Sequence, residues 1–280
     1  MIRSLLYVPG SNERFLEKAH RRGADAIIID LEDAVAPNAK TAAREALAQS
    51  VPIVAQSGAK VFVRINSEAG RLSEDAVAAC RAGADGLYVP KVASAEILQG
   101  IDATLRPIEA ELARGPRALV PLIEDPAALF EARSIARGPR VLALCAGGED
   151  IATAMGARPT PEVLRLPKLM VHLAAKAERV LSFGLLRSVA DYDDVDALKA
   201  AAREARDFGF DGASCIHPSV VAVLNEAFAP SEDEVEWAQK VVEAGDQAAA
   251  DGVGAFTLEG RFIDAPIVER ARALLVRATR

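Results

Sequence analysis

The sequence has few cysteines, no long apolar run and no excess of basic residues. Its three cysteines, Cys80, Cys145 and Cys215, lie far apart without a C-x-x-C pair, which argues against disulfides or a zinc site and predicts buried thiols. No apolar stretch approaches the roughly 18 residues of a membrane span. The apolar run near the N-terminus ends at Pro9, so it predicts a first strand rather than a signal peptide, and we expect a cytoplasmic protein. A net charge of −7 argues against a nucleic-acid partner.

The dominant pattern is an alternation of short β-branched runs with amphipathic helical stretches. Helical spacing is clear at Leu198, Ala202 and Ala205, for example. Strand–helix alternation predicts a parallel sheet with right-handed crossovers, and eight repeats close a (β/α)₈, or TIM, barrel, which needs about 250 residues. The eight runs are Leu5–Val8, Ala26–Ile29, Val61–Ile65, Gly86–Val89, Ala118–Ile123, Val141–Cys145, Leu185–Val189 and Ala213–Ile216.

Glycines mark the points where predicted helices turn into the next strand. They occur in the segments Arg22–Asp25, Arg81–Asp85 and Phe208–Asp211, each placed where a helix C-terminus needs one. The alternative architecture is a doubly wound open sheet, which would place G-x-G-x-x-G after the first strand. The residues there, Pro9-Gly10-Ser11-Asn12, do not match. The sequence therefore favours a barrel over residues 1–228.

After residue 228 the pattern changes. Ser231–Ala250 predicts one long helix, with Ser231 and Glu234 forming a capping box. A glycine-punctuated stretch at 252–260 precedes a closing helix from about Pro266. We expect residues 229–280 to form a helical extension. This extension would cover the active site of a neighbouring subunit.

Charged or polar residues follow nearly every predicted strand. Active sites of such barrels lie at the carboxyl ends of the strands, so these residues predict a polar site at the barrel mouth. They are Asp30, Glu32 and Asp33 after the second strand, Arg64 and Asn66 at the third, Lys91 at the fourth, Glu124 and Asp125 at the fifth, Glu149 and Asp150 at the sixth, and His217 at the eighth.

Glu124, Glu149 and Asp150 offer hard oxygen ligands, with no cysteine or paired histidine nearby. This composition suits Mg²⁺, which accepts one or two carboxylates and takes the rest of its shell from water and substrate. A 2-oxo acid supplies a chelating pair of oxygens, and the metal would polarise its carbonyl. The alternative for Glu124 is an N-cap, since Pro126 follows in the first turn of the next helix.

Arg64 is the candidate that binds a substrate carboxylate or developing enolate, through its planar fork of donors. The alternative is a surface salt bridge. Lys40 and Arg44 lie about one helical turn apart and could contact phosphates, although a solvated helix face explains them equally well. His217, followed by Pro218, is as consistent with a structural turn as with catalysis.

Seven motifs occur in an order that resembles the citrate lyase beta-subunit family, which includes malyl-CoA and citramalyl-CoA lyases. The resemblance extends from residue 5 to about 270. The motifs are Leu-Tyr-Val-Pro-Gly, Asp-Leu-Glu-Asp-Ala-Val, Val-Arg-Ile-Asn, Val-Pro-Lys, Leu-Ile-Glu, Gly-Glu-Asp and Ile-His-Pro.

The resemblance implies Mg²⁺ on Glu124 and Asp150, and the substrate carboxylate on Arg64 and the metal. It also implies pantetheine and phosphate contacts near the first two strands, and a homo-oligomer, commonly a trimer. In the acyl-CoA members, an aspartate in a tail motif like Phe262–Pro266 comes from a neighbouring subunit and acts as the base, which makes Asp264 the candidate.

Two positions depart from related patterns. The family often has Gly-Lys shortly before Ile-His-Pro, whereas Ala213 follows Gly212 here. Related metal-dependent aldolases for sugar acids carry a histidine base at the position of Asp33, so its absence argues against that branch.

These residues predict a Mg²⁺-dependent carbon–carbon lyase that cleaves a hydroxy-acyl-CoA, such as malyl-CoA or citramalyl-CoA, to acetyl-CoA and a 2-oxo acid. The 2-oxo acid could be pyruvate, glyoxylate or oxaloacetate, because one methyl group changes binding by only about 1–3 kcal/mol. One alternative is a citrate lyase beta subunit that acts on a carrier-protein citryl thioester. Another is a non-catalytic acyl-CoA-binding scaffold, which the set of Arg64, Glu124 and Asp150 disfavours.

Overall fold

The computed structural model describes residues 1–188 and 193–278. The chain forms two compact units. The larger comprises residues 2–225, and the smaller comprises Met1 and residues 226–280. The sequence predicted a boundary after residue 228. The observed boundary, between residues 225 and 226, lies within the helix Ser219–Phe228.

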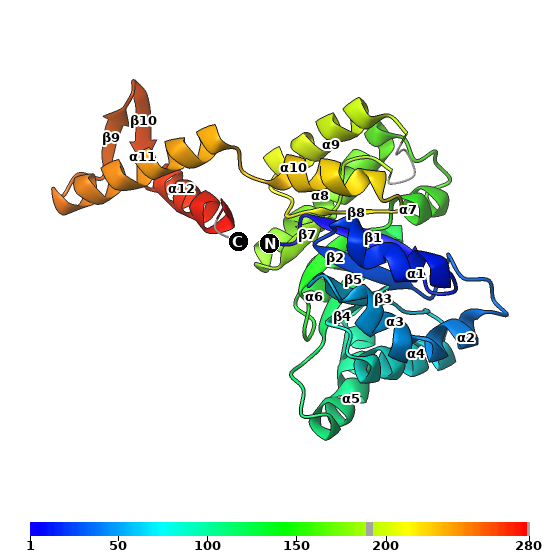
Figure 1. Ribbon diagram of the computed structural model, residues 1–280. Coiled ribbons are helices and arrows are strands. Elements are labelled where there is room, and N and C mark those ends of the chain that lie inside the picture. The colour runs from blue at the N-terminus through cyan, green and yellow to red at the C-terminus, as the bar shows by residue number, and fades with distance from the viewer. Residues whose placement is uncertain (189–192, 279–280) are drawn as a thin grey trace. The chain divides into compact units, whose positions relative to one another are not determined.

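Eight parallel strands form the centre of the larger unit (Figure 1). Each strand from β1 to β6 pairs with the next along the chain, and β8 pairs with β1. A bridge between Phe183 and Gly212 links the two ends of the sheet, so the barrel is nearly closed. The strands are β1 (Ser4–Pro9), β2 (Ala26–Asp30), β3 (Lys60–Arg64), β4 (Gly86–Val89), β5 (Ala118–Ile123), β6 (Ala143–Ala146), β7 (Leu181–Phe183) and β8 (Ala213–Cys215).

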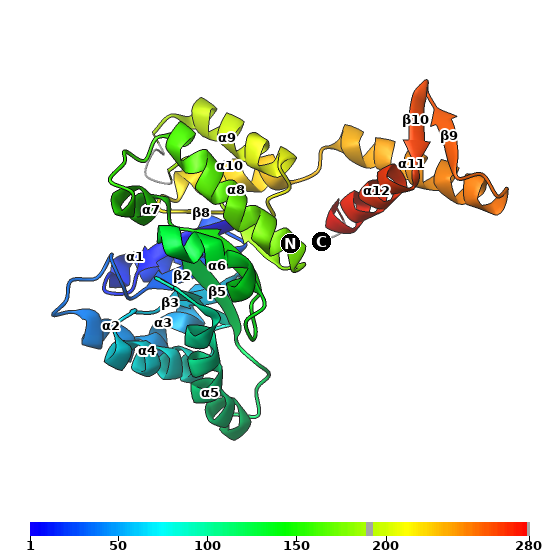
Figure 2. The ribbon, with the colours of Figure 1, turned by 180° about the vertical axis from the view of Figure 1, so that it is seen from behind.

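Helices surround this sheet on its outer face (Figures 1 and 2). Apolar side chains that include Ile28, Phe62 and Tyr88 fill the barrel interior, as expected for strands buried on both faces. The helical segments are α1 (Glu13–Ala19), η1 (His20–Arg22), α2 (Lys40–Glu45), α3 (Leu47–Val54), α4 (Ala69–Ala82), α5 (Ala95–Glu111), α6 (Pro126–Ala136), α7 (Gly148–Ala154), α8 (Pro161–Ala177), α9 (Val195–Asp207) and α10 (Ser219–Phe228).

The predicted (β/α)₈ barrel is confirmed, with one strand misplaced. The seventh run was expected at 185–189, but β7 is Leu181–Phe183, where Leu181 pairs with Ala143. Leu185 and Leu186 are buried outside any strand, so their apolar character reflects packing rather than strand pairing. Val189 lies outside the described residues.

The glycines predicted at helix ends adopt the left-handed conformation. Gly23, Gly83 and Gly209 have φ values of 72°, 93° and 93°, which residues with a side chain rarely adopt. Each ends a helix just before the chain enters the next strand, so this local prediction is confirmed.

The smaller unit contains α11 (Glu232–Ala250), the antiparallel strands β9 (Ala255–Leu258) and β10 (Arg261–Asp264), and α12 (Ala265–Ala278). It has its own core, which includes Val241 and Ile263. The capping box of Ser231 and Glu234 at the start of α11 is confirmed. The β9–β10 hairpin was not predicted. Over all described residues, no helix is both long and apolar enough to cross a membrane.

Candidate active site

A cavity of about 430 Å³ opens at the carboxyl ends of the barrel strands. Arg64, Glu124 and Asp150, which the sequence predicted as site residues, all line it. They come from the ends of β3, β5 and β6, far apart in the sequence. The other described lining residues are Tyr7, Pro9, Asp30, Asp33, Ala34, Leu122, Cys145, Ala146, Gly147, Gly148, Glu149, Lys168, Ser188, Ser214 and Ile216.

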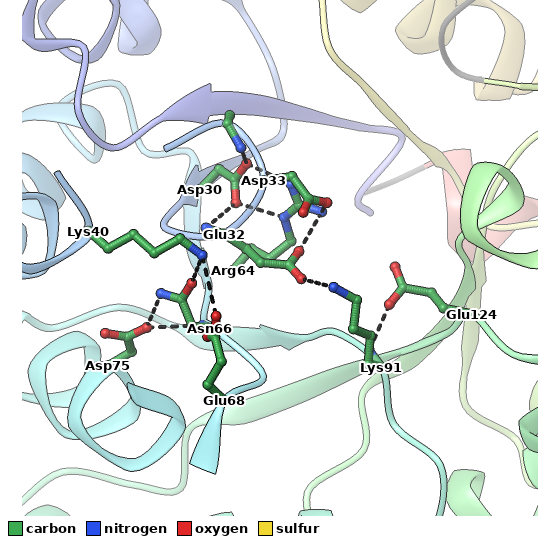
Figure 3. Close-up of polar contacts among 11 residues, drawn as sticks. Asp30, Glu32, Asp33, Lys40, Arg64, Asn66, Glu68, Asp75, Lys91 and Glu124 are labelled. Carbon is green, nitrogen blue, oxygen red and sulfur yellow. Dashed lines mark hydrogen bonds and ion pairs between the residues drawn. The ribbon is translucent and has the colours of Figure 1, made fainter. Parts of the chain in front are cut away.

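Arg64, the last residue of β3, is a buried cation surrounded by carboxylates (Figure 3). Its Nε and Nη2 donate to the two oxygens of Asp30 at 2.7 and 2.6 Å. Its Nη1 lies 3.0 Å from Glu32 and 3.2 Å from Asp33. The guanidinium also lies 5.0 Å from the ring centre of Tyr7, within reach of a cation–π interaction.

The Arg64 side chain is only 13% exposed, which excludes the surface salt bridge considered above. Burial alone would lower the pKa of the guanidinium, but the hydrogen bonds to Asp30 and the neighbouring negative charges outweigh it and raise that pKa. Arg64 is therefore a fixed positive charge in the cavity wall.

Glu124 directly follows β5, and its side chain is buried at 7% exposure. One carboxylate oxygen accepts a hydrogen bond of 2.7 Å from the backbone amide of Lys91. The N-cap of α6 is Asp125, whose carboxylate accepts from the Ala127 amide. The capping alternative for Glu124 is therefore wrong. A side chain at Gly147 would place a Cβ 2.4 Å from Glu124 Cγ, so glycine there makes room for the carboxylate.

Burial raises the pKa of Glu124 to about 7, and the negative charges of Asp150 and Glu32 add to the effect, while the Lys91 amide opposes it. Asp150 lies in the first turn of α7 and lines the same cavity. Two carboxylates that face one cavity favour a bound cation between them.

The donor set fits Mg²⁺. Both carboxylates offer hard oxygens, and Mg²⁺ takes one or two of these and completes its shell with water and substrate. Over residues 1–188 and 193–278, no three His, Cys, Asp or Glu side chains are placed to hold a metal ion together. The protein would thus supply few ligands, which leaves positions open for a chelating substrate.

Glu149, the third carboxylate considered as a ligand, also lines the cavity and accepts a hydrogen bond from Ser188 Oγ. Lys168 of α8 lies nearby, with its Nζ donating to the Arg187 carbonyl at 2.9 Å. Burial lowers the pKa of the Lys168 ammonium.

Several lining residues were missed by the sequence analysis. Lys168 occupies the interior of a long amphipathic helix, and Tyr7 lies within an apolar strand. Neither follows the carboxyl end of a strand, which was the signal used. The three cysteines are free and buried, as predicted, and Cys145 contributes to the cavity wall.

Lys40 and Arg44 of α2 form a cluster beside β3 (Figure 3 shows Lys40). Lys40 Nζ donates to Asn66, and Arg44 pairs with Glu74 at 2.6 Å and with Asp75 at 3.4 Å. Their side chains are 12% and 17% exposed, so a solvated helix face does not describe them. Their contact with phosphates stays a prediction.

The remaining two candidates are His217 and Asp264. His217 bonds through Nδ1 with the Ser219 hydroxyl at the start of α10, which supports a structural role in the turn. Asp264 ends β10, pairs with Ala255 in the hairpin of the smaller unit and precedes α12. Its role as a base stays a prediction.

Comparison with known proteins gives consistent matches over nearly the whole chain. Residues 3–218 match the model of a family described as HpcH/HpaI aldolase/citrate lyase. The chain is 34% identical to the citrate lyase subunit beta of Haemophilus influenzae, covering 99% of this chain and 96% of that protein. It is also 34% identical to a (3S)-malyl-CoA thioesterase of Cereibacter sphaeroides, covering 99% and 94%.

Among solved structures, the chain is similar to the protein CitE from Mycobacterium tuberculosis in complex with magnesium, acetoacetate and coenzyme A. The TM-score is 0.80 at 28% identity, covering 99% of this chain and 98% of that one.

The raised pKa of Glu124 predicts a pH-dependent stability of the metal-free protein. Because the folded-state pKa exceeds the ordinary value of 4.5, this group's contribution to stability is fully present below about 4.5 and is lost as the pH rises through about 7. The loss amounts to up to about 3 kcal/mol. Glu124→Gln keeps the shape of the side chain without its charge. The free energy of unfolding of this variant, relative to that of the wild type, should therefore increase as the pH rises from 5 to 8.

Urea unfolding of both proteins with EDTA at the two pH values measures this difference. The same protonation should make Mg²⁺ compete with a proton, so that calorimetry shows up to about tenfold weaker Mg²⁺ binding per pH unit below 7. Parallel stabilities of the wild type and Glu124→Gln over this range would contradict the assigned pKa.

Proposed function

The chain belongs to the HpcH/HpaI aldolase/citrate lyase family, and on that basis we propose that it is a Mg²⁺-dependent carbon–carbon lyase. Its substrate is a hydroxy-acyl-CoA of the malyl-CoA or citramalyl-CoA kind, which it cleaves to acetyl-CoA and a 2-oxo acid. The observation that carries the proposal is the cavity itself, where one buried guanidinium and two converging carboxylates line a single space.

Glu124 and Asp150 are the proposed Mg²⁺ ligands, and the ion, when bound, supplies Lewis-acid polarisation of the 2-oxo acid carbonyl. Arg64 is the proposed partner of the substrate carboxylate. Asp30, Glu32 and Asp33 already contact its Nε, Nη2 and Nη1, so the substrate carboxylate shares the remaining donor capacity or displaces one of these contacts. The two bonds to Asp30 hold the guanidinium in a fixed orientation before substrate arrives.

In the cleavage direction the carbon–carbon bond of the hydroxy-acyl group breaks. Its electron pair forms the enolate of acetyl-CoA. The hydroxyl loses its proton to a base, and the carbon that carried it becomes the 2-oxo acid carbonyl. The enolate must then gain a proton at its methylene carbon, and in the reverse direction the methyl group of acetyl-CoA must lose one.

We assign this proton transfer to Asp264 of a neighbouring subunit in a homo-oligomer, such as a trimer. Asp264 lies at the end of β10, after Gly252, Gly254 and Gly260 and just before Pro266. Its carboxylate is therefore anchored between a hairpin strand and a helix, at a defined point of the smaller unit.

Thioester hydrolysis is a second candidate, favoured by the similarity to a (3S)-malyl-CoA thioesterase. It would use the same substrate, with water attacking the thioester carbonyl to release CoA and the hydroxy acid. Action on a carrier-protein citryl thioester is the corresponding alternative from the similarity to citrate lyase subunit beta. A non-catalytic acyl-CoA scaffold gives no reason for the charged lining of the cavity.

Product analysis on a panel of thioesters tests the proposal. The protein is incubated with malyl-CoA, citramalyl-CoA and citryl-CoA, with Mg²⁺ or with EDTA. A lyase yields equal amounts of the shortened acyl-CoA and a 2-oxo acid, whereas a thioesterase yields free CoA and no 2-oxo acid. We expect the lyase products with Mg²⁺ only, and none from Glu124→Ala or Asp150→Ala.

Arg64→Lys should lower activity about 30-fold or more, because losing such a charged contact costs roughly 2–5 kcal/mol and an ammonium cannot replace the fork. Arg81→Lys is the matched control, since Arg81 makes a similar two-bond pair with Glu111 on the outer helices.

Lyase activity that persists in EDTA or in Glu124→Ala would refute the metal assignment.

Subunit mixing tests Asp264. Inactive Asp264→Ala and inactive Glu124→Ala proteins, mixed under conditions that allow subunit exchange, should regain part of the activity. The physical reason is that a mixed oligomer can combine an intact Asp264 on one subunit with an intact Glu124 on another. If activity stays absent although exchange is demonstrated, or if Asp264→Ala alone is active, Asp264 is not a base acting across subunits.

A further inference from the structure

Lys91, two residues after the end of β4, has a backbone conformation that lysine rarely adopts. Its φ is +53°, in the left-handed region. Such a conformation has an energetic cost for a residue with a side chain, and it persists where the surrounding structure stabilises it. Lys91 lies near a strand end, yet it has no part in the proposed Mg²⁺ site or in the proposed binding of the substrate carboxylate.

This conformation places the backbone amide of Lys91 against Glu124. The amide donates a 2.7 Å hydrogen bond to Oε2 of that carboxylate. Hydrogen bonds from such groups fix the orientation of metal-binding side chains. With Oε2 held by the amide, the carboxylate has one defined orientation, in which Glu124 lines the cavity that it shares with Asp150.

The side chain of Lys91 extends to Glu32, away from Glu124 (Figure 3). Its Nζ donates to Glu32 Oε1 at 2.9 Å. Glu32 is only 3% exposed, and its other oxygen lies 3.0 Å from Arg64 Nη1. A continuous series of contacts therefore runs from Arg64 through Glu32 and Lys91 to Glu124.

We propose that Lys91 is a positioning residue for Glu124: its left-handed backbone directs the amide that orients the metal-binding carboxylate. The ion pair with Glu32 offsets the cost of that conformation. The proposal rests on the proposed function, since it takes Glu124 as a metal ligand. It differs from a role for the Lys91 ammonium in binding substrate, because the group that acts is the amide.

Substitutions at residue 91 separate these two roles. Lys91→Gly removes the ammonium but keeps the amide, and glycine adopts a positive φ without cost, so it needs no ion pair. Lys91→Val also removes the ammonium and keeps the amide, but a β-branched residue strongly resists the left-handed conformation. The two variants thus share the loss of charge and differ in backbone preference.

Arg179→Val is the matched control. Arg179 has a φ of +59°, close to that of Lys91, and lies between α8 and β7, before the amino end of that strand. This substitution forces the same backbone conflict at the opposite end of the barrel from the cavity. It reports the loss of stability that such a conflict causes without any effect on Glu124.

The measurement is the dissociation constant for Mn²⁺, used as a probe of the metal site, on the full chain without substrate, by water-proton relaxation. Thermal unfolding of each metal-free variant accompanies it. We expect Lys91→Val to bind Mn²⁺ about tenfold or more weakly, as is typical when a group that supports a ligand is lost. Lys91→Gly should bind far more tightly than Lys91→Val, and Arg179→Val should bind like the wild type although it is destabilised.

Equal weakening in Lys91→Gly and Lys91→Val would show that the ammonium acts, and would overturn the proposal. Wild-type affinity in Lys91→Val would overturn it as well. If Lys91→Val does not fold, Lys91→Ala replaces it, since alanine also disfavours the left-handed region. Glu124→Ala is measured alongside: if it binds Mn²⁺ like the wild type, the metal assignment itself fails, which is a distinct result.

Discussion

Buried negative charge at the carboxyl ends of the barrel strands is the constraint on which the rest of the site depends. Asp30, Glu32 and Glu124 are all less than a tenth exposed, and ionised carboxylates in such positions require compensation. Arg64 compensates Asp30 and Glu32, and Lys91 adds a second cation at Glu32. Glu124 instead accepts a hydrogen bond from the neutral backbone amide of Lys91, and the negative charge of Asp150 acts on it. Burial is the main cause of the raised pKa of Glu124, and the charge of Asp150 adds to it. The same lack of a compensating cation supports the proposal of a divalent cation.

The closed parallel sheet makes this concentration of charge possible. Each strand from β1 to β6 pairs with its successor in parallel, and β8 pairs with β1 in parallel, so all carboxyl ends lie at one end of the barrel. Residues as far apart in the sequence as Asp30 and Asp150 thereby line one cavity. The apolar interior below them, with Phe62 and Tyr88 fully buried, holds the strand ends in register.

The sequence predicted the elements of this fold where the signal was local. The glycine C-caps and the Ser231–Glu234 capping box depend on a few adjacent residues, and both were confirmed. The seventh strand was misplaced because an apolar run records burial, and Leu185 is buried in a loop. The β9–β10 hairpin was missed because the glycines at 252–260 were interpreted only as a stretch between two helices.

For the site, the sequence predicted which charged residues follow strands but not their partners. Asp125, and not Glu124, caps α6. The two carboxylates are adjacent in the sequence, so only the three-dimensional structure shows which of them accepts the hydrogen bond at the helix start. The left-handed conformation of Lys91 and the burial of Lys168 arise from tertiary contacts, which have no sequence signature. Local chemistry was therefore predictable, whereas its long-range pairing was not.

We propose that Glu124 and Asp150 hold a divalent cation that a 2-oxo acid chelates, with the acid's carboxylate near Arg64. A crystal structure with Mn²⁺ and pyruvate, with data collected at the manganese absorption edge, tests it most directly. We expect an anomalous peak bound by Glu124 and Asp150, with pyruvate bonded to the ion and to Arg64. A peak elsewhere, or pyruvate bound without contact to the ion, would contradict it.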